Sequence, residues 1–206
     1  MHPSKKHFNA WARHYDRDYI WGRYFKEGYA RTINIIESFN GYKSKILDIG
    51  CGTGELEKIL VGKFPEINII AIDFAERMVE IAKKKNENQR VKVFLEDIND
   101  IQFEKEKFNF VIALNVLHHI KDVETLFSSA GRMLVSGGYI IILDPLRDGI
   151  LRKAWCSLLK NVLIPEYGIK YLAETEVLNA ATAQGFMHVS SENVYYFSKL
   201  LVLRKK

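Results

Sequence analysis

From Lys45 to Leu143, short runs of consecutive apolar residues alternate with segments in which apolar residues recur at helical spacing. Runs that are apolar at every position indicate parallel strands covered by helices on both faces. We therefore predict an α/β fold built on a doubly wound sheet. The expected strands are 45–49, 67–73, 91–95, 108–114 and 139–143, and the expected helices are 54–63, 75–85 and 122–134, the last stopped by Ser136-Gly137-Gly138.

The last part of the chain has a different pattern. Helical spacing over 151–163 and 174–184 is followed by two strand-like segments, 186–195 and 197–203, with a very short link between them. Strands so close in sequence pair as an antiparallel hairpin. We expect this hairpin at one edge of the sheet, where it adds an antiparallel strand to the parallel ones.

Residues 1–44 precede the first expected strand and carry a dense series of aromatic side chains. We expect a helical cap over 1–44 and a sheet domain over 45–206, together forming a single structural domain. Within the cap, Trp11, Tyr15 and Tyr19 recur every four residues, which predicts that they share one face of a helix. Packing of the cap onto the sheet and coverage of a ligand cleft both account for these aromatics, and the two roles are compatible.

The most informative motif is ILDIGCGTGEL, residues 46–56, in which an apolar strand ends in glycines at positions 50, 52 and 54. Ligands of open α/β sheets bind beyond the carboxyl ends of the strands. A dinucleotide site requires its third glycine where this chain has Glu55, and the Gly-Lys-Ser/Thr of a P-loop is missing. A carboxylate there disfavours phosphate at the helix N-terminus. The motif therefore predicts a ligand that is cationic or zwitterionic near Asp48, such as an amino-acid ammonium next to a sulfonium.

Polar residues also end the neighbouring strands, at the same edge of the sheet. Asp73 ends the second strand, where an acid can accept hydrogen bonds from both hydroxyls of a ribose. Asp97 follows the third strand as an acceptor for an adenine amino group, beside Ile98, which can cover the ring. Asn115 follows the fourth strand. Because NAD sites share the ribose acid, Asp73 by itself indicates an adenosine and not a particular cofactor.

With these motifs in this order, the chain resembles the class I S-adenosylmethionine-dependent methyltransferases, in particular the small-molecule group that contains the quinone-biosynthesis methyltransferases. The matching segments are 8–19, 46–56, 71–84, 94–100, 108–122, 134–145 and 171–186. The resemblance implies a Rossmann-like seven-stranded sheet of order 3-2-1-4-5-7-6 with strand 7 antiparallel. It also implies that 45–206 binds S-adenosylmethionine and leaves S-adenosylhomocysteine as the product.

The resemblance further assigns residues to the cofactor. It places Gly50 and Gly52 against the methionine part and Asp73 on the ribose, with Phe74 and Met78 on either side of the adenine. The whole predicted cofactor site, including two tyrosines that fold over it from the cap, consists of Asp48, Gly50, Gly52, Gly54, Asp73, Phe74, Met78, Asp97, Ile98, Asn115, Tyr15 and Tyr19.

Methyl transfer from a sulfonium is an in-line displacement, so the protein mainly aligns the donor with the acceptor and excludes water. A general base is needed only when the acceptor must lose a proton, as a phenol or a thiol does. The candidate bases are His118 and His119, just after the fourth strand, because histidine titrates near neutral pH. A structural role, capping the turn or binding a backbone carbonyl, also accounts for these histidines.

The acceptor chamber is expected between the aromatic cap and the segment 146–172, which is rich in Leu, Ile, Trp and Tyr. These side chains predict a small acceptor of apolar, aromatic or lipid-like character. Nucleic-acid acceptors are disfavoured, because Asn115-Val116-Leu117-His118 stands where amino-methylating DNA enzymes carry Asn/Asp-Pro-Pro-Tyr/Phe. Two alternative functions stay open: a noncatalytic S-adenosylmethionine-binding scaffold or assembly factor, and, less favoured, an NAD(P)-dependent oxidoreductase.

Composition excludes other classes. The net charge is +5, but basic residues are mostly interleaved with acids, so we expect no nucleic-acid partner. No apolar run approaches the roughly 18 residues of a membrane span, and the N-terminus lacks the apolar core of a signal peptide. Cys51 and Cys156 lie far apart without metal-ligand spacing. We therefore expect a cytoplasmic monomer or homodimer without a metal site.

Overall fold

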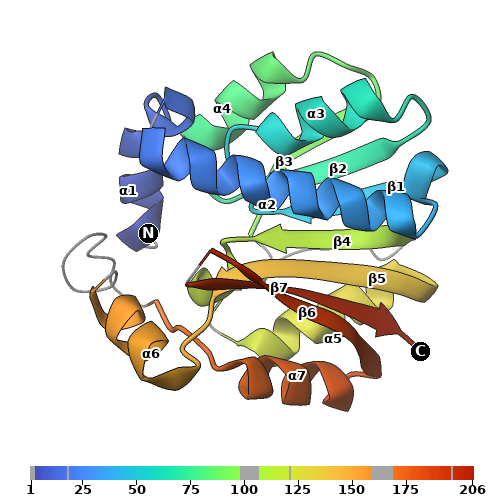
Figure 1. Cartoon of the computed structure of the whole chain (residues 1–206). Helices are drawn as coiled ribbons and strands as arrows, with labels where there is room; N and C mark the ends of the chain where they lie inside the picture. Colours follow the sequence, from blue (N-terminus) through green and yellow to red (C-terminus); the bar gives the residue numbers. More distant parts are fainter. Residues whose placement is uncertain (1–2, 18, 98–106, 121, 159–168, 196) are drawn as a thin grey trace.

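The computed structural model describes residues 3–17, 19–97, 107–120, 122–158, 169–195 and 197–206. A seven-stranded sheet of order β3-β2-β1-β4-β5-β7-β6 runs through the molecule (Figure 1). Strands β1 to β5 are parallel, and β7 is antiparallel to both β5 and β6. The predicted fold and strand order are thus confirmed. The strands are β1 Lys45–Ile49, β2 Asn68–Asp73, β3 Val91–Leu95, β4 Phe108–Leu114, β5 Leu134–Pro145, β6 Phe186–Val194 and β7 Ser198–Lys205.

Helices cover both faces of the sheet. Helices α2, α3 and α4 lie on one face and α5 and α7 on the other, while α6 lies at one end of the molecule (Figure 1). The apolar strands separate two cores accordingly: Ile36 and Leu60 belong to the first, and Phe127 and Val177 to the second. The helical elements are α1 Pro3–Trp11, η1 Tyr15–Arg17, α2 Tyr19–Ser38, η2 Gly41–Lys43, α3 Glu55–Lys63, α4 Glu76–Lys85, η4 Leu117–His119, α5 Val123–Met133, α6 Gly149–Leu158 and α7 Glu174–Ala183.

The fifth strand is longer than predicted. Helix α5 ends at Met133, and β5 begins directly at Leu134 and runs through Gly137 and Gly138 to Pro145. The pairing of β4 with β5 shifts register between Phe108 and Phe110, opposite these glycines. The Ser-Gly-Gly sequence therefore forms an irregular stretch of strand and not a turn, because glycine also allows the backbone of a bulge.

The N-terminal aromatics do not share one helix face, so this part of the prediction is wrong. Trp11 ends α1, Tyr15 begins η1, and Tyr19 begins α2. The rings of Trp11 and Tyr15 nevertheless meet edge to face, with centroids 4.8 Å apart. A tertiary contact accounts for the break, since Asp16 accepts a 2.6 Å hydrogen bond from the Thr53 hydroxyl in the glycine turn. The division into a cap over 1–44 and a sheet domain over 45–206 stays a prediction.

The last two expectations about helices concern the segment after β5 and membrane-spanning length. The predicted helix over 151–163 appears as α6, which ends at Leu158, and residues 159–168 lie outside the described part of the chain. None of the described helices has both the length and the apolar character that a membrane crossing requires.

Candidate active site at the carboxyl edge of the sheet

The glycine turn between β1 and α3 has a backbone that only glycine adopts readily. Gly50, Gly52 and Gly54 have φ angles of +74°, +55° and +78°. A Cβ atom on Gly50 would lie 2.7 Å from a methyl group of Val116, whereas one on Gly52 would meet nothing closer than the Tyr15 ring at 3.7 Å. Gly50 therefore allows close packing against the end of β4. A carbon atom on Gly52 would be in van der Waals contact with the Tyr15 ring, so Tyr15 covers the turn at this point.

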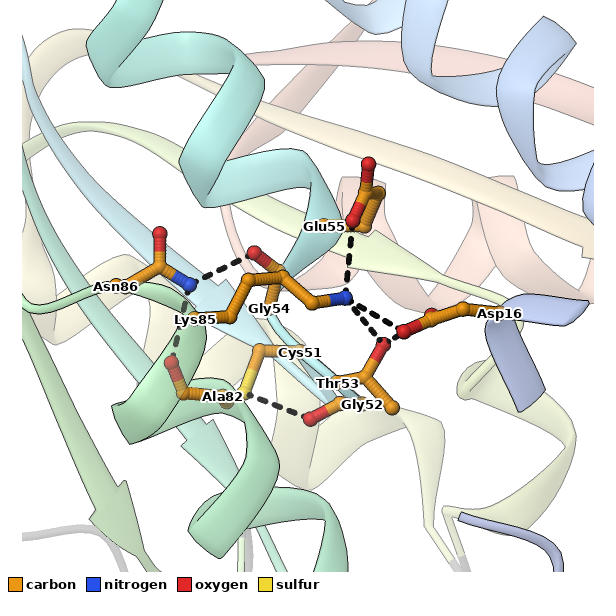
Figure 2. A network of polar contacts seen from close by, with 9 residues as sticks. All are labelled: Asp16, Cys51, Gly52, Thr53, Gly54, Glu55, Ala82, Lys85 and Asn86. Atoms are coloured by element: carbon orange, nitrogen blue, oxygen red, sulfur yellow. Dashed lines mark hydrogen bonds and ion pairs between the residues drawn. The ribbon is translucent and has the colours of Figure 1, made fainter. Parts of the chain in front are cut away.

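The third glycine serves helix packing. A Cβ atom on Gly54 would lie 2.5 Å from the Asn86 amide nitrogen and 3.0 Å from Ala82, both near the end of α4. Asn86 donates hydrogen bonds to the Gly54 carbonyl at 2.8 Å and to the Ala82 carbonyl at 3.1 Å (Figure 2). The absence of a side chain at Gly54 thus brings α3 and α4 together.

Asp73, at the end of β2, holds the turn from the other side. Its carboxylate accepts a 2.9 Å hydrogen bond from the Gly52 amide and a 2.8 Å bond from the Ala75 amide. The residue is only 7% exposed, and burial raises its pKa to about 6 although these hydrogen bonds lower it. The acid predicted to bind a ribose therefore also connects the glycine turn to the start of α4.

A pocket opens at the carboxyl ends of β1, β2, β3 and β4. It is lined by apolar side chains together with carboxylates, a mixture typical of a small-molecule site. Five predicted site residues line it: Gly50, Asp73, Phe74, Asp97 and His119. Sequence reasoning missed the apolar residues of the lining, because their spacing resembles that of any core residue. The remaining lining residues are Ile49, Ile72, Glu96, Val116 and Ile120.

Helix α1 supplies an aromatic neighbour of this pocket that the sequence did not single out. The Phe8 ring lies edge-on to Phe74, at 5.8 Å, and to His119, at 5.3 Å. Helix α1 is held near α4 by Glu76, which accepts a 2.8 Å hydrogen bond from Asn9 and pairs with Lys5 at 2.6 Å. These polar contacts place Phe8 beside two residues of the pocket.

Other predicted cofactor residues occupy different surroundings. Met78 does not line the pocket but is buried with Ala12 and Ala75, in a small cluster that Phe8 and Tyr15 cover. The Tyr15 ring stacks on Phe25 at 4.9 Å, and burial raises the pKa of its hydroxyl. Tyr19 is the first residue of α2, and nothing more of it is described. Ile98 lies outside the described residues.

Lys85 links the glycine turn to the N-terminal segment. Its ammonium lies 2.7 Å from Asp16, 2.9 Å from Glu55 and 3.2 Å from the Thr53 hydroxyl (Figure 2). From the sequence, the Glu55 carboxylate was expected to face a ligand at the turn. In the structure Lys85 neutralises Glu55, so Glu55 does not disfavour a phosphate there.

Two buried acids, Asp48 in β1 and Glu57 in α3, lie near the glycine turn. Asp48 is 4% exposed and Glu57 is 0% exposed. Burial raises the pKa of Asp48 to about 6, and burial together with the nearby Asp48 charge raises the pKa of Glu57 well above its usual range. Sequence spacing places Glu57 in the first turn of α3, but only the packing of α3 on β1 and α2 shows that it points inward.

A second polar group lies where β4 and β5 end. The Nδ1 atom of His118 is 3.0 Å from both carboxylate oxygens of Asp144, which is 1% exposed and also accepts a 2.9 Å hydrogen bond from the Leu117 amide. The His118 ring lies 4.1 Å from the His119 ring, centroid to centroid. His119 lines the pocket, and the preceding residue, His118, lies beside a buried carboxylate.

Asn115, at the end of β4, has a φ angle of +56°. Its side-chain oxygen accepts a 2.6 Å hydrogen bond from the Tyr24 hydroxyl, which lies 2.7 Å from the Ser198 hydroxyl. Tyr24 therefore connects α2 to the ends of β4 and β7. Neither Tyr24 nor Ser198 was recognised from sequence, since the contact joins segments far apart along the chain. Within the described residues, no group of three His, Cys, Asp or Glu side chains is placed to hold a metal ion.

Comparison with known proteins agrees with this geometry. A family described as a methyltransferase domain matches residues 47–142. The malonyl-[acyl-carrier protein] O-methyltransferase of Priestia megaterium is 34% identical over 140 residues, which cover 64% of this chain and 50% of the relative. Phosphoethanolamine N-methyltransferase 2 of Caenorhabditis elegans is 27% identical over 194 residues, covering 87% of this chain and 41% of the relative. The chain thus spans about half the length of such relatives or less.

Solved structures share the fold. The magnesium protoporphyrin IX methyltransferase of Synechocystis, crystallised with bound S-adenosylhomocysteine, superposes with a TM-score of 0.73 at 15% identity, covering 92% of this chain and 88% of that one. The matched domain lies over the strands that build the pocket, and the strand order is the one expected from the family resemblance. Residues 47–142 thus form a methyltransferase domain, in a chain whose fold is that of solved S-adenosylmethionine-dependent methyltransferases.

Proposed function

We propose that the protein transfers a methyl group from S-adenosylmethionine to a small-molecule acceptor. The observation that carries this proposal is the pocket at the carboxyl edge, where Asp73, Phe74 and Asp97 lie beside the glycine turn. Two carboxylates suit the hydroxyls of a ribose and the amino group of an adenine, and the apolar lining suits the adenine ring. When bound there, S-adenosylmethionine supplies an activated methyl group.

The turn itself fits the amino-acid end of such a donor. Gly52 exposes its backbone toward the Tyr15 ring, with which a Cβ atom on Gly52 would be in van der Waals contact. The Asp48 carboxylate, in β1 just before the turn, favours an ammonium group there over a phosphate. The roles predicted for Met78, Ile98, Asn115 and Tyr19 stay proposals that rest on the family resemblance.

We assign the role of general base to His118 in preference to His119. A histidine whose Nδ1–H is donated to a carboxylate keeps the lone pair on Nε2, and the carboxylate stabilises the imidazolium once a proton arrives. Asp144 is placed to do this for His118. His119 instead lines the pocket proposed for adenosine. His118 would accept the proton of a hydroxyl or thiol acceptor as the bond to the methyl carbon forms.

We propose an acceptor of apolar or aromatic character. In α6, Ile150 and Leu151 are 86% and 84% exposed, and Trp155 stacks on Phe197 with ring centroids 4.0 Å apart. Exposed apolar side chains on one short helix suit contact with an apolar ligand. The names of the relatives do not select the acceptor, because one acts on a malonyl carrier protein and another on phosphoethanolamine.

Two measurements test the proposed function. Isothermal titration is expected to show that S-adenosylhomocysteine binds and that NADH does not. Binding of NADH without binding of S-adenosylhomocysteine would contradict the proposal. A screen of phenols, quinols, thiols, amines and fatty acids with labelled S-adenosylmethionine is then expected to show transfer to an apolar or aromatic acceptor. Cofactor binding with transfer to none of these classes would favour the scaffold function.

The proposal also covers the compartment, the oligomeric state and the partners of the protein. We propose a cytoplasmic protein that is a monomer or a homodimer and has no nucleic-acid partner. Both cysteines, Cys51 and Cys156, are free thiols, which suits a reducing compartment. Light scattering coupled to gel filtration measures the oligomeric state, and a mass above that of a dimer contradicts this expectation.

A further inference from the structure

Glu57 is a buried acid that methyl transfer, as described above, does not use. It is 0% exposed. No donor group of another described residue hydrogen-bonds to either of its carboxylate oxygens, and the Asp48 carboxyl is its side-chain partner. An ionised carboxylate without partners costs several kcal/mol to bury, so natural proteins neutralise it, pair it or give it a ligand. Glu57 is therefore expected to be protonated or to be paired with a cation.

The groups that surround Glu57 do not supply a cation. Those close enough to influence its titration, or to be influenced by it, come from β1, the glycine turn, α2 and α4; they are Asp48, Cys51, Tyr29 and Lys85. Lys85 is the one base among them, and its ammonium already lies within 3 Å of Asp16 and Glu55. The hydroxyl of Thr32, also fully buried on α2, has no hydrogen-bond partner among the described residues either.

Two carboxylates in one buried site do not both stay ionised without a counter-charge, and they titrate as a pair. We propose that Asp48 and Glu57 share one proton in the ligand-free protein and release it to solvent when the ammonium group of S-adenosylmethionine or S-adenosylhomocysteine binds beside the glycine turn. The inference rests on the proposed function, because it uses the same site. It makes Glu57 a positioning residue that selects ligands with a cationic amino-acid end.

The ammonium offsets the negative charge that the departing proton leaves on the pair. Before binding, the pair carries one proton and one negative charge; after binding, it carries two negative charges facing one ammonium, and the ligand's own carboxylate keeps its zwitterionic end neutral overall. No covalent bond changes apart from the O–H bond that breaks as the proton leaves for water. A ligand with the same adenosine but no amino-acid end, such as 5′-methylthioadenosine, supplies no ammonium and leaves the proton in place.

Isothermal titration in two buffers of different ionisation heat, phosphate and Tris at about pH 7, counts the released protons. With S-adenosylhomocysteine, the wild type and the control variant Glu55→Gln are expected to release up to one proton, and Glu57→Gln close to none. Glu57→Gln is also expected to bind S-adenosylhomocysteine at least tenfold more weakly, while its affinity for 5′-methylthioadenosine is unchanged. Equal proton release by the wild type and Glu57→Gln would overturn the inference.

A ligand-free measurement separates this inference from the proposed function. A raised carboxyl pKa contributes stability that is present at low pH and is lost as the pH rises through the folded-state value. The melting temperature of Glu57→Gln should therefore exceed that of the wild type more at about pH 8 than at about pH 5, and Asp48→Asn should behave similarly. An equal difference at both pH values for both variants refutes the shared proton. Failure to bind S-adenosylhomocysteine, with this pH effect intact, refutes only the cofactor assignment.

Discussion

The Nδ1 atom of His118 lies 3.0 Å from both oxygens of the Asp144 carboxylate. The two residues lie at the carboxyl ends of neighbouring parallel strands. His118 comes shortly after β4, and Asp144 is the second-last residue of β5. Asp144 is further held by the Leu117 amide. The sheet therefore fixes the orientation of the His118 ring before any acceptor arrives, which is the arrangement that a general base requires.

We expect Asp144→Asn to slow transfer to hydroxyl or thiol acceptors by roughly 10²- to 10⁴-fold, since asparagine no longer favours the reactive tautomer of His118 or stabilises its cation. The dissociation constant of S-adenosylhomocysteine should change by no more than about twofold, because Asp144 does not line the adenosine pocket. Single-turnover transfer of labelled methyl measures the first quantity and titration the second. Parallel losses in both would show that Asp144 is only structural.

Asp73→Ala should weaken S-adenosylhomocysteine binding by about 1–3 kcal/mol through lost charge-assisted hydrogen bonds. The structure adds an effect on stability, because the Gly52 and Ala75 amides both lose their acceptor. Asp73→Asn retains one oxygen and should lose less of the folding free energy. Titration and urea unfolding of both variants check these effects; unchanged binding in Asp73→Ala would place the ribose elsewhere.

Alanine at Gly54 should destabilise the protein by more than about 2 kcal/mol, since it combines a positive φ angle with a Cβ atom only 2.5 Å from Asn86. Gly149 offers a matched control: its φ angle is +74°, but a Cβ atom there meets nothing within 4 Å. Gly149→Ala should therefore cost only the conformational penalty, about 1 kcal/mol. Urea unfolding compares the two variants, and equal losses would mean that packing at Gly54 contributes nothing.

Much of the sheet could be predicted from the sequence because its central strands, β1, β2 and β4, are buried on both faces. The predicted bounds of β1, β3 and β4 agree with the structure residue for residue, since each is a compact run bounded by polar or turn-forming residues. The position of Asp73 and Asp97 at one pocket follows from the rule that parallel strands end at the same edge. Such features depend on local pattern and topology alone.

The parts that sequence missed depend on tertiary contacts. Phe8 reaches the pocket only because α1 packs on α4, and Glu57 faces inward only because α2 covers α3 and β1. The helix through Tyr15 breaks where Asp16 binds Thr53. None of these pairings leaves a periodic signal in the chain, and each joins segments separated by more residues than a motif spans.

Lys85 should hold the N-terminal segment against the glycine turn. Lys85→Met removes ion pairs to Asp16 and Glu55, whose side chains are 41% and 34% exposed, and a contact to the Thr53 hydroxyl, which keeps Asp16 as its acceptor. The free energy of unfolding should therefore fall by only about 0–1 kcal/mol. Proteolysis within the first residues should nevertheless accelerate, because local opening costs less than global unfolding. The exposed neighbour Lys84 provides the control variant Lys84→Met. Equal cleavage rates in both variants would show that the network does not hold this segment.

Stability should be greatest near about pH 5, because two sets of carboxyl groups act in opposite directions. Asp48 and Asp73 have pKa values raised to about 6 by burial, so the stability they contribute is lost as the pH rises through that value. Glu174 and Glu176 have lowered pKa values, so their contribution is lost as the pH falls toward acid. For Asp73, a rise from 3.8 to about 6 corresponds to roughly 3 kcal/mol.

Asp73→Asn should therefore flatten the decline in melting temperature between about pH 5 and pH 7.5, while leaving the acid limb unchanged. Glu176→Gln should do the reverse, because its carboxylate pairs with Arg147 at 2.6 Å and is stabilised in the charged form. Thermal unfolding across this range measures both limbs. A wild-type melting temperature that rises steadily from about pH 5 to pH 7.5 would contradict this expectation. It would mean that the buried acids at the glycine turn ionise at little cost, because the site is better solvated than its burial indicates.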